Sequence, residues 1–164
     1  IDNYLLIFFF FYVTSGKYLT EISAQQLSWL EETLASNKTK PTLIFFHAPL
    51  AGTLAQYNKE VNTPNFIAQP EKQLHNLLIK NPQILLWVSG HTHTPATNPS
   101  FDETINLYEG KILDLHNPTL DGKIIWTNSI YLYPDKIFIR TFNHNTGEFV
   151  ESLDRTLPVN LAAK

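Results

Sequence analysis

Three short apolar runs, separated by two amphipathic segments, constrain this chain more than any other feature of its sequence. The runs occupy residues 4–13, 41–46 and 84–89, and they are rich in Phe, Ile, Leu, Val and Tyr. Runs of this length and composition are typical of strands that are buried on both faces of a sheet. Because the runs alternate with helical patterns, the order of elements predicts an α/β fold with a largely parallel sheet.

The segments between the runs carry helical signals. Ser23 precedes the first segment and Gln26 follows three residues later, which is typical of a capping box. Pro70 suits the first turn of the second helix. Apolar residues share one face of each segment, and these are Leu27, Leu30 and Leu34, then Leu74, Leu77 and Leu78. Residues 48–69 hold Pro, Gly and Asn without a period, which predicts a long loop.

The pattern changes after Thr94. Short apolar stretches follow, separated by Gly, Pro and Asn, and they read KILDLH, KIIWTNSIYLY and KIFIRTFNHNTGEFVESL. They predict strands without a further helix, with a hairpin turn at residues 143–148. We interpret the change as a second sheet, so the predicted fold class is α/β, with mixed β-sheets in a sandwich flanked by helices. The length allows one domain with a substantial core, and we expect residues 1–164 to form a single domain.

Composition narrows the classes of function. The net charge is −3 and the 12 Lys and Arg residues are scattered, so nothing in the charge pattern favours nucleic acid. The sequence has no cysteine, which excludes disulfides and thiolate metal sites. The apolar run at residues 4–13 is about half as long as a transmembrane helix. A cleaved or anchoring segment is the alternative, but we expect a buried strand, no membrane span and a cytoplasmic location.

Three histidines follow predicted strands directly. His47 comes after the run at residues 41–46, and His91 and His93 come after the run at residues 84–89. The carboxyl ends of strands are where α/β folds bind their ligands, so the two loops should converge. Residues i and i+2 of an extended segment point the same way, so His91 and His93 should present both rings to one cavity. Imidazole is a common metal ligand, which predicts a metal site. The alternative is that these are ordinary polar loop residues.

The chain resembles the C-terminal half of a calcineurin-like metallophosphoesterase, from about residue 4 to residue 150. The resemblance is carried by SAQQLSWLEETLASNKTKPTLIFFHAPL and then, after a helix, by LLWVSGHTHTP. Two details are specific, namely the lone His47 shortly before Pro49 and the Gly-His-x-His sequence at residues 90–93. The stretch TNSIYLYPDKIFIRTFNHNTGEF is similar to the closing strands of that fold.

The resemblance implies a centre of two divalent ions, such as Mn, Fe or Zn, between two β-sheets flanked by helices. Carried over by motif, His47 and His91 would bind one ion and His93 would bind the other. The implied reaction is attack of a metal-bridging hydroxide on the phosphorus of a phosphomonoester or phosphodiester.

The chain also departs from the family pattern. The family supplies an Asp-x-His, a Gly-Asp and an Asn-His pair before the lone histidine, and none of these precedes His47. We therefore expect the chain alone to bind at most one ion and to be inactive, and its catalytic residues are unknown. A non-catalytic binding or scaffold module of the same fold is the alternative function.

Two later stretches are candidates for the missing motifs. A circular permutant would use Asp114 with His116 and Asn143 with His144. The interval between them is too short for the helical unit that each motif closes in the family, because such a unit takes roughly 30 residues or more. We therefore interpret His116 as the end of a strand and His144 as part of a hairpin turn.

Other features give structural expectations. We expect a core position for the three tryptophans, which are Trp29, Trp87 and Trp126, and an exposed position for His75. The family's sheets are completed by strands that this chain lacks, so an apolar face or an open sheet edge should remain. We therefore expect a homodimer or larger assembly that covers this surface.

Overall fold

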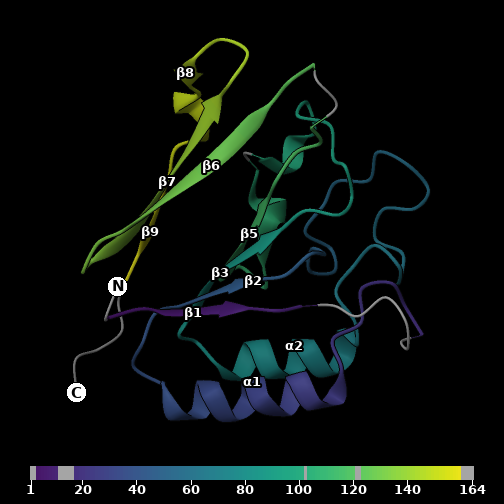
Figure 1. Cartoon of the computed structure of the whole chain (residues 1–164), viewed down its shortest axis with the longest axis vertical. Helices are drawn as coiled ribbons and strands as arrows, with labels where there is room; N and C mark the ends of the chain where they lie inside the picture. The colour runs from purple at the N-terminus through teal and green to yellow at the C-terminus, as the bar shows by residue number, and fades with distance from the viewer. Residues whose placement is uncertain (1–2, 11–16, 102, 121–122, 160–164) are drawn as a thin grey trace.

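The first sheet has five strands and is largely parallel, as predicted. The structure is a computed structural model that describes residues 3–10, 17–101, 103–120 and 123–159. The strand order is β1-β2-β3-β5-β4 (Figure 1), in which the first four pair in parallel and β4 pairs antiparallel with β5. The strands are β1 (Leu5–Phe8), β2 (Thr42–Phe45), β3 (Ile84–Ser89), β4 (Leu107–Tyr108) and β5 (Ile112–His116).

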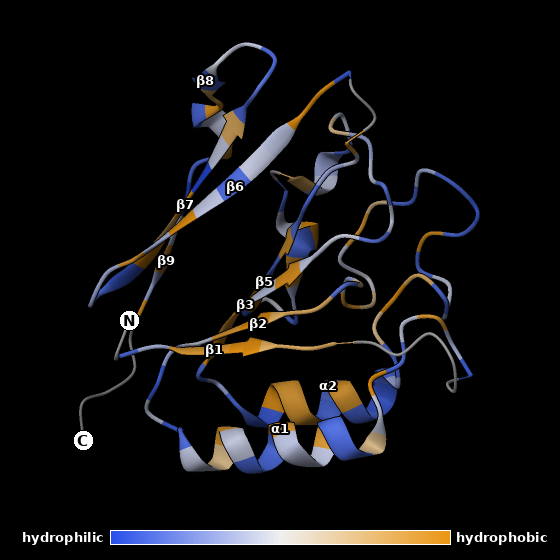
Figure 2. Ribbon diagram, viewed as in Figure 1, coloured by the Kyte–Doolittle hydropathy of each residue, from blue (hydrophilic) through white to orange (hydrophobic). Residues whose placement is uncertain are grey.

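Two α-helices, α1 (Ala24–Ser36) and α2 (Glu71–Lys80), lie along one face of this sheet (Figure 1). The capping box at α1 is confirmed, because the Ser23 hydroxyl accepts from the Gln26 amide at 3.2 Å and the Gln26 side chain accepts from the Ser23 amide at 3.0 Å. Each helix turns an apolar face toward the sheet (Figure 2). The buried leucines are Leu30 and Leu34 in α1 and Leu74 and Leu78 in α2.

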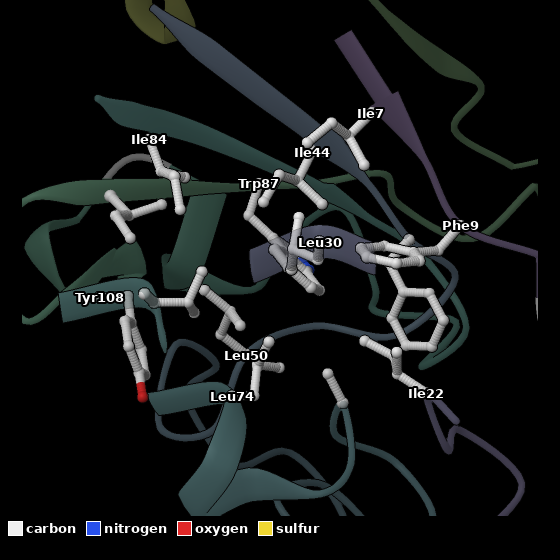
Figure 3. Packing of buried hydrophobic residues seen from close by; sticks show 14 of the residues in the cluster. Ile7, Phe9, Ile22, Leu30, Ile44, Leu50, Leu74, Ile84, Trp87 and Tyr108 are labelled. Atoms are coloured by element: carbon white, nitrogen blue, oxygen red, sulfur yellow. The ribbon is translucent and has the colours of Figure 1, made fainter. Parts of the chain in front are cut away.

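The core between the helices and the sheet is centred on Trp87. Its indole is fully buried and donates to the carbonyl of Ala48 at 3.0 Å. Figure 3 shows this ring among side chains of the strands, the helices and the loop after β2. The prediction of a core position is wrong for Trp29, which is 48% exposed, because the helical turn that directs Leu30 inward directs its neighbour outward.

The second sheet is antiparallel and covers the other face of the first sheet (Figure 1). It consists of β6 (Trp126–Leu132), β7 (Lys136–Asn143), β8 (Glu148–Phe149) and β9 (Arg155–Pro158), and β7 pairs with all three others. The cluster between the sheets joins the inner face of the first sheet to the inner face of β7. Its buried members are Tyr4, Leu43, Leu86, Leu113, Leu115, Ile137 and Ile139.

The connections of this half also match the sequence pattern. The predicted hairpin turn is present, with the amide of Gly147 donating to the carbonyl of Asn143 at 2.9 Å and a Gly147 φ of 74°. Within its described residues this half has no α-helix, only three one-turn 3-10 segments. These are η1 (Pro99–Phe101), η2 (Thr104–Asn106) and η3 (Glu151–Leu153). The chain is therefore a mixed α/β structure of two facing sheets, with helices on the outer face of the first.

One long-range contact ties the two sheets together at the start of the chain. The hydroxyl of Tyr4 lies 2.6 Å from the carbonyl of Tyr133 and 3.1 Å from that of Lys136, both at the β6–β7 turn. The first pair is separated by 129 residues of sequence. The N-terminal strand therefore depends on the second sheet for one of its polar contacts.

The expectation that the first apolar run is buried on both faces is wrong for its described part. β1 pairs only with β2 among the described strands, and Phe8 and Phe10 are 56% and 76% exposed. Leu6 packs against the cluster between the sheets, whereas Phe8 lies beyond the cover of the second sheet and stacks on Phe45 at 4.5 Å. Residues 11–13 of the predicted strand lie outside the described residues. Among the helices that the structure describes, none has the length and apolar character needed to cross a membrane.

Candidate metal-binding site

The fold brings the loop after β2 against the end of β3. The amide of Phe46 donates to the carbonyl of Val88 at 3.1 Å, and the amide of Gly90 donates to the carbonyl of His47 at 2.9 Å. These bonds continue the parallel pairing of β2 and β3 beyond the strands themselves. His47 and His91 therefore lie at neighbouring carboxyl strand ends, as the sequence predicts.

The segment that carries His91 and His93 is a tight turn. The two residues have φ values of 66° and 49°, so the premise of an extended segment is wrong. The turn forms because the chain buries Thr92 and Thr94, whose hydroxyls lie 2.7 Å apart, and because the hydroxyl of Tyr57 donates to the carbonyl of Thr92. The threonines thus take the inner side of the turn, while His91 is half-buried and His93 is exposed.

His47 and His91 are in direct contact. Nε2 of His47 lies 2.9 Å from Nδ1 of His91, and the ring centroids are 4.6 Å apart. Nε2 of His91 lies 2.9 Å from the carbonyl of Asn65, which can only accept a hydrogen bond and so assigns the Nε2–H tautomer to a neutral His91. That tautomer leaves the lone pair of His91 on Nδ1, the atom that faces His47.

The long loop between β2 and α2 supplies contacts that the sequence did not predict. The carbonyl of Asn65 bonds His91, and the ring of Phe66 lies 5.1 Å from the His91 ring. A backbone carbonyl can belong to any residue type, so no sequence signal marks this contact.

The environment favours the neutral form of His47. Partial removal from water lowers the pKa of His47, and the nearby His91 and His93 lower it further because they would carry like charge. A neutral imidazole is the form that binds a metal ion.

The geometry of the pair fits two ligands of a single ion. Two nitrogens that bind one ion at about 2.0–2.1 Å lie roughly 2.9–3.4 Å apart, and the observed separation is 2.9 Å. Nothing in the described part of the chain completes the set, since no three His, Cys, Asp or Glu side chains there are grouped so as to hold an ion. The structure thus brings two of the three predicted ligands together, and a role for His93 stays a prediction.

The residues of the permutant alternative lie elsewhere. Asp114 and His116 are buried inside the first sheet, 0% and 3% exposed, and they bond to neighbouring protein groups. His144 lies in the hairpin after β7, with Nε2 2.8 Å from the hydroxyl of Thr127. His75 is half-buried, and its Nδ1 lies 2.8 Å from the hydroxyl of Tyr108, so the expectation that it is exposed is only partly met.

Comparison with known proteins gives a likeness of fold. No family model matches the sequence, and no curated protein matches it. A crystal structure of a dimetal phosphatase from Danio rerio is similar, with a TM-score of 0.56 and 18% sequence identity. The match covers 86% of this chain and 39% of that chain, so this chain spans about two-fifths of the length of the solved structure. At this identity the likeness concerns the fold.

Proposed function

We propose that this chain is part of a metal-dependent phosphoesterase of the calcineurin-like type, corresponding to the C-terminal part of the domain. The observation that carries the proposal is the contact between His47 and His91 at adjacent carboxyl strand ends. The likeness of fold to a dimetal phosphatase supports it. The substrate would be a phosphomonoester or a phosphodiester.

The residues of the chain have distinct tasks in this proposal. His47 and His91 would hold one divalent ion, and His93 would serve a second ion once further ligands are supplied. The carbonyl of Asn65 keeps the proton of His91 on Nε2, which leaves a lone pair on Nδ1. In this structure that lone pair faces Nε2 of His47 at 2.9 Å, and both nitrogens would turn to the ion once His47 carries its proton on Nδ1. A bound ion would act as a Lewis acid and lower the pKa of a water molecule.

We expect the chain alone to bind at most one ion and to hydrolyse phosphate esters negligibly. Two ions at ≈ 3.5–4 Å repel strongly unless a bridging carboxylate balances them, and no described Asp or Glu joins the histidines in a group that could hold an ion. The measurements are calorimetric titration with Zn²⁺, Mn²⁺ and Ni²⁺, and turnover of an aryl phosphomonoester and diester.

The control for this experiment is a histidine outside the site. The double change His91→Ala, His93→Ala should abolish binding, whereas His144→Ala in the β7–β8 hairpin of the second sheet should leave it unchanged. Equal loss in both variants would count against the site. Metal-dependent turnover by the chain alone would show that its own residues complete the centre.

A non-catalytic binding or scaffold module is the second candidate. It is favoured by the same lack of a completing carboxylate within the described residues. The two functions differ in their response to the rest of such a domain. If the chain is a half-site, a longer form of the protein should gain metal-dependent turnover, whereas a scaffold should gain none.

We also propose that the chain associates with a second copy through the open edge of β1. Support comes from the exposed rings of Phe8 and Phe10 and from the single partner strand of β1 within the described sheet. Unpaired strand edges beside apolar side chains tend to acquire a partner.

A further inference from the structure

A buried polar cluster joins the two segments that carry His47 and His91, and the proposed function does not use it. Its side chains come from the loop after β2 (Thr53), from the end of β3 (Ser89) and from β5 (Asp114 and His116), and each is at least nine-tenths buried. A buried polar group without a hydrogen-bond partner costs free energy, so the hydrogen bonds of this cluster constrain the positions of the segments that it joins.

Asp114 joins the two segments that carry the histidines. Its Oδ2 accepts from the amide of Leu50 at 2.7 Å and from the hydroxyl of Thr53 at 2.8 Å, both in the loop that begins at His47. Its Oδ1 lies 2.7 Å from the hydroxyl of Ser89, which stands two residues before His91. The carboxyl group of Asp114 on β5 therefore makes hydrogen bonds both to the loop after β2 and to the end of β3.

His116 closes the cluster from the other side. Its Nε2 donates to the carbonyl of Thr53 at 3.0 Å, and its Nδ1 lies 3.0 Å from the hydroxyl of Ser89. The two anchored segments are thus held by a ring of hydrogen bonds that runs through both side chains of β5.

Each of the two hydroxyls in this cluster contacts two other groups. Ser89 Oγ lies 2.7 Å from Asp114 Oδ1 and 3.0 Å from His116 Nδ1. Thr53 Oγ1 lies 2.8 Å from Asp114 Oδ2 and 2.8 Å from the carbonyl of Leu50. A hydroxyl donates one proton and also accepts, so both hydroxyls can be satisfied inside the cluster.

We propose that Asp114 is a positioning residue for the histidine pair: it sets the contact between His47 and His91 by bonding Leu50, Thr53 and Ser89. The inference rests on the proposed function for its consequence, metal binding, but the positioning itself concerns the chain alone. An asparagine has the same shape and can donate to Ser89 while it accepts from Leu50 and Thr53. An alanine at this place leaves those groups without partners.

The test compares Asp114→Ala and Asp114→Asn with the wild-type chain at one fixed pH. The first readout is Zn²⁺ affinity by calorimetry, and the second is the NMR chemical shifts of the His47 ring without metal. The matched control is Gln83→Ala, which removes another buried side chain that bonds a backbone carbonyl, that of Leu34, at the opposite end of β3.

We expect Asp114→Ala to lose roughly 10–100-fold in Zn²⁺ affinity, with Asp114→Asn and Gln83→Ala close to the wild type. The His47 shifts of Asp114→Ala should move to those of a His91→Ala chain, because both changes remove the contact between the rings. If Asp114→Ala does not fold, Thr53→Val removes one of the same bonds and should shift His47 part of the way.

The inference would be overturned if the His47 ring of Asp114→Ala kept its wild-type chemical shifts. If Asp114→Ala does not fold, wild-type shifts in Thr53→Val would overturn it in the same way. It would also be overturned if Asp114→Asn did not have the wild-type shifts of His47. A wild-type chain that binds no Zn²⁺ would instead refute the proposed function. The NMR comparison would still decide whether Asp114 positions the pair.

Discussion

At the scale of single residues, the left-handed backbone at His91 and His93 is the feature that the sequence did not reveal. Spacing of i and i+2 predicts rings on one side only if the chain is extended, and here both residues have positive φ. The tight turn still places successive side chains on opposite sides, so Thr92 and Thr94 are buried while His91 and His93 lie on the outer side. The pairing of His47 with His91 could be predicted from strand ends, whereas the contacts of Asn65 and Asp114 could not.

The positive φ of His93 predicts that glycine at this position gives a more stable chain than alanine, the reverse of their order in a helix. A residue with a Cβ costs roughly 1–2 kcal/mol in the left-handed region, and glycine does not bear this cost. We expect His93→Gly to be more stable than His93→Ala by about 1 kcal/mol in urea unfolding. At Ala35, an exposed position of α1, Ala35→Gly should destabilise by a similar amount. The same order at both positions would contradict the turn geometry.

The buried carboxyl of Asp114 predicts a dependence of stability on pH. Burial raises the pKa of Asp114, outweighing the opposing effects of His116, Ser89, Leu50 and Thr53. A raised pKa means that the folded chain keeps a proton that the unfolded carboxyl releases above about pH 3.9, so this contribution to stability is lost as the pH rises. His116 is the one titratable partner of Asp114 among the described contacts.

Asp114→Asn isolates that effect because its side chain does not titrate. The free energy of unfolding of the wild type, minus that of Asp114→Asn, should fall as the pH rises above about 4, by at most ~1.4 kcal/mol per pH unit. Urea unfolding followed by fluorescence of the buried Trp87 measures it. A difference that does not fall as the pH rises from 4 would contradict the raised pKa.

At the scale of elements, the sequence predicted the helices and strands whose formation depends on residues close together in the chain. The apolar runs correctly predicted β2 and β3. Leucines at helical spacing correctly predicted α1 and α2 and the face of each helix that packs against the sheet. The order β3-β5-β4 and the 3-10 turns depend on contacts distant in sequence, so periodicity could not predict them. The loop at residues 48–69 was predicted as a loop, but its path to His91 is set by tertiary contacts.

The capping box of α1 gives a prediction at this scale. Ser23→Ala removes the acceptor of the Gln26 amide and should destabilise the chain by about 1 kcal/mol. Ser28→Ala lies on the exposed side of the same helix, where its contact to Glu32 is long, and should change stability by less than about 0.5 kcal/mol. Thermal unfolding of both variants measures the difference, and equal effects would show that the cap contributes nothing.

At the scale of the whole molecule, the two faces of the first sheet are covered differently. The helices cover one face along its length, and the second sheet covers the other face only over the part that includes Leu6. Beyond that cover, the exposed ring of Phe8 stacks on Phe45, which is half-buried at the edge of the cluster between the sheets. This uneven cover explains why an apolar run that reads as fully buried has exposed rings.

Association through this surface should disappear when its rings become charged. We expect the wild-type chain to form dimers or larger assemblies at tens of micromolar, and Phe8→Lys, Phe10→Lys to be monomeric, by multi-angle light scattering. Tyr131→Lys changes an exposed aromatic residue on β6 of the other sheet and should leave the assembly intact. A monomeric wild type, or an assembly that persists in the double variant, would exclude this interface.

The bond from Tyr4 to the β6–β7 turn has a consequence for the order of events during synthesis. The hydroxyl of Tyr4 finds its acceptor, the carbonyl of Tyr133, only after 129 further residues have been added. At about 5–20 residues per second, the ribosome needs roughly 6–26 s to make them. Until the end of that interval the strand beside Tyr4 has neither this acceptor nor the cover of β7, whereas α1 and β2 become available to it much earlier. The segment around Tyr4 therefore reaches its final packing only after β7 has been made, although it leaves the exit tunnel before α1 and β2.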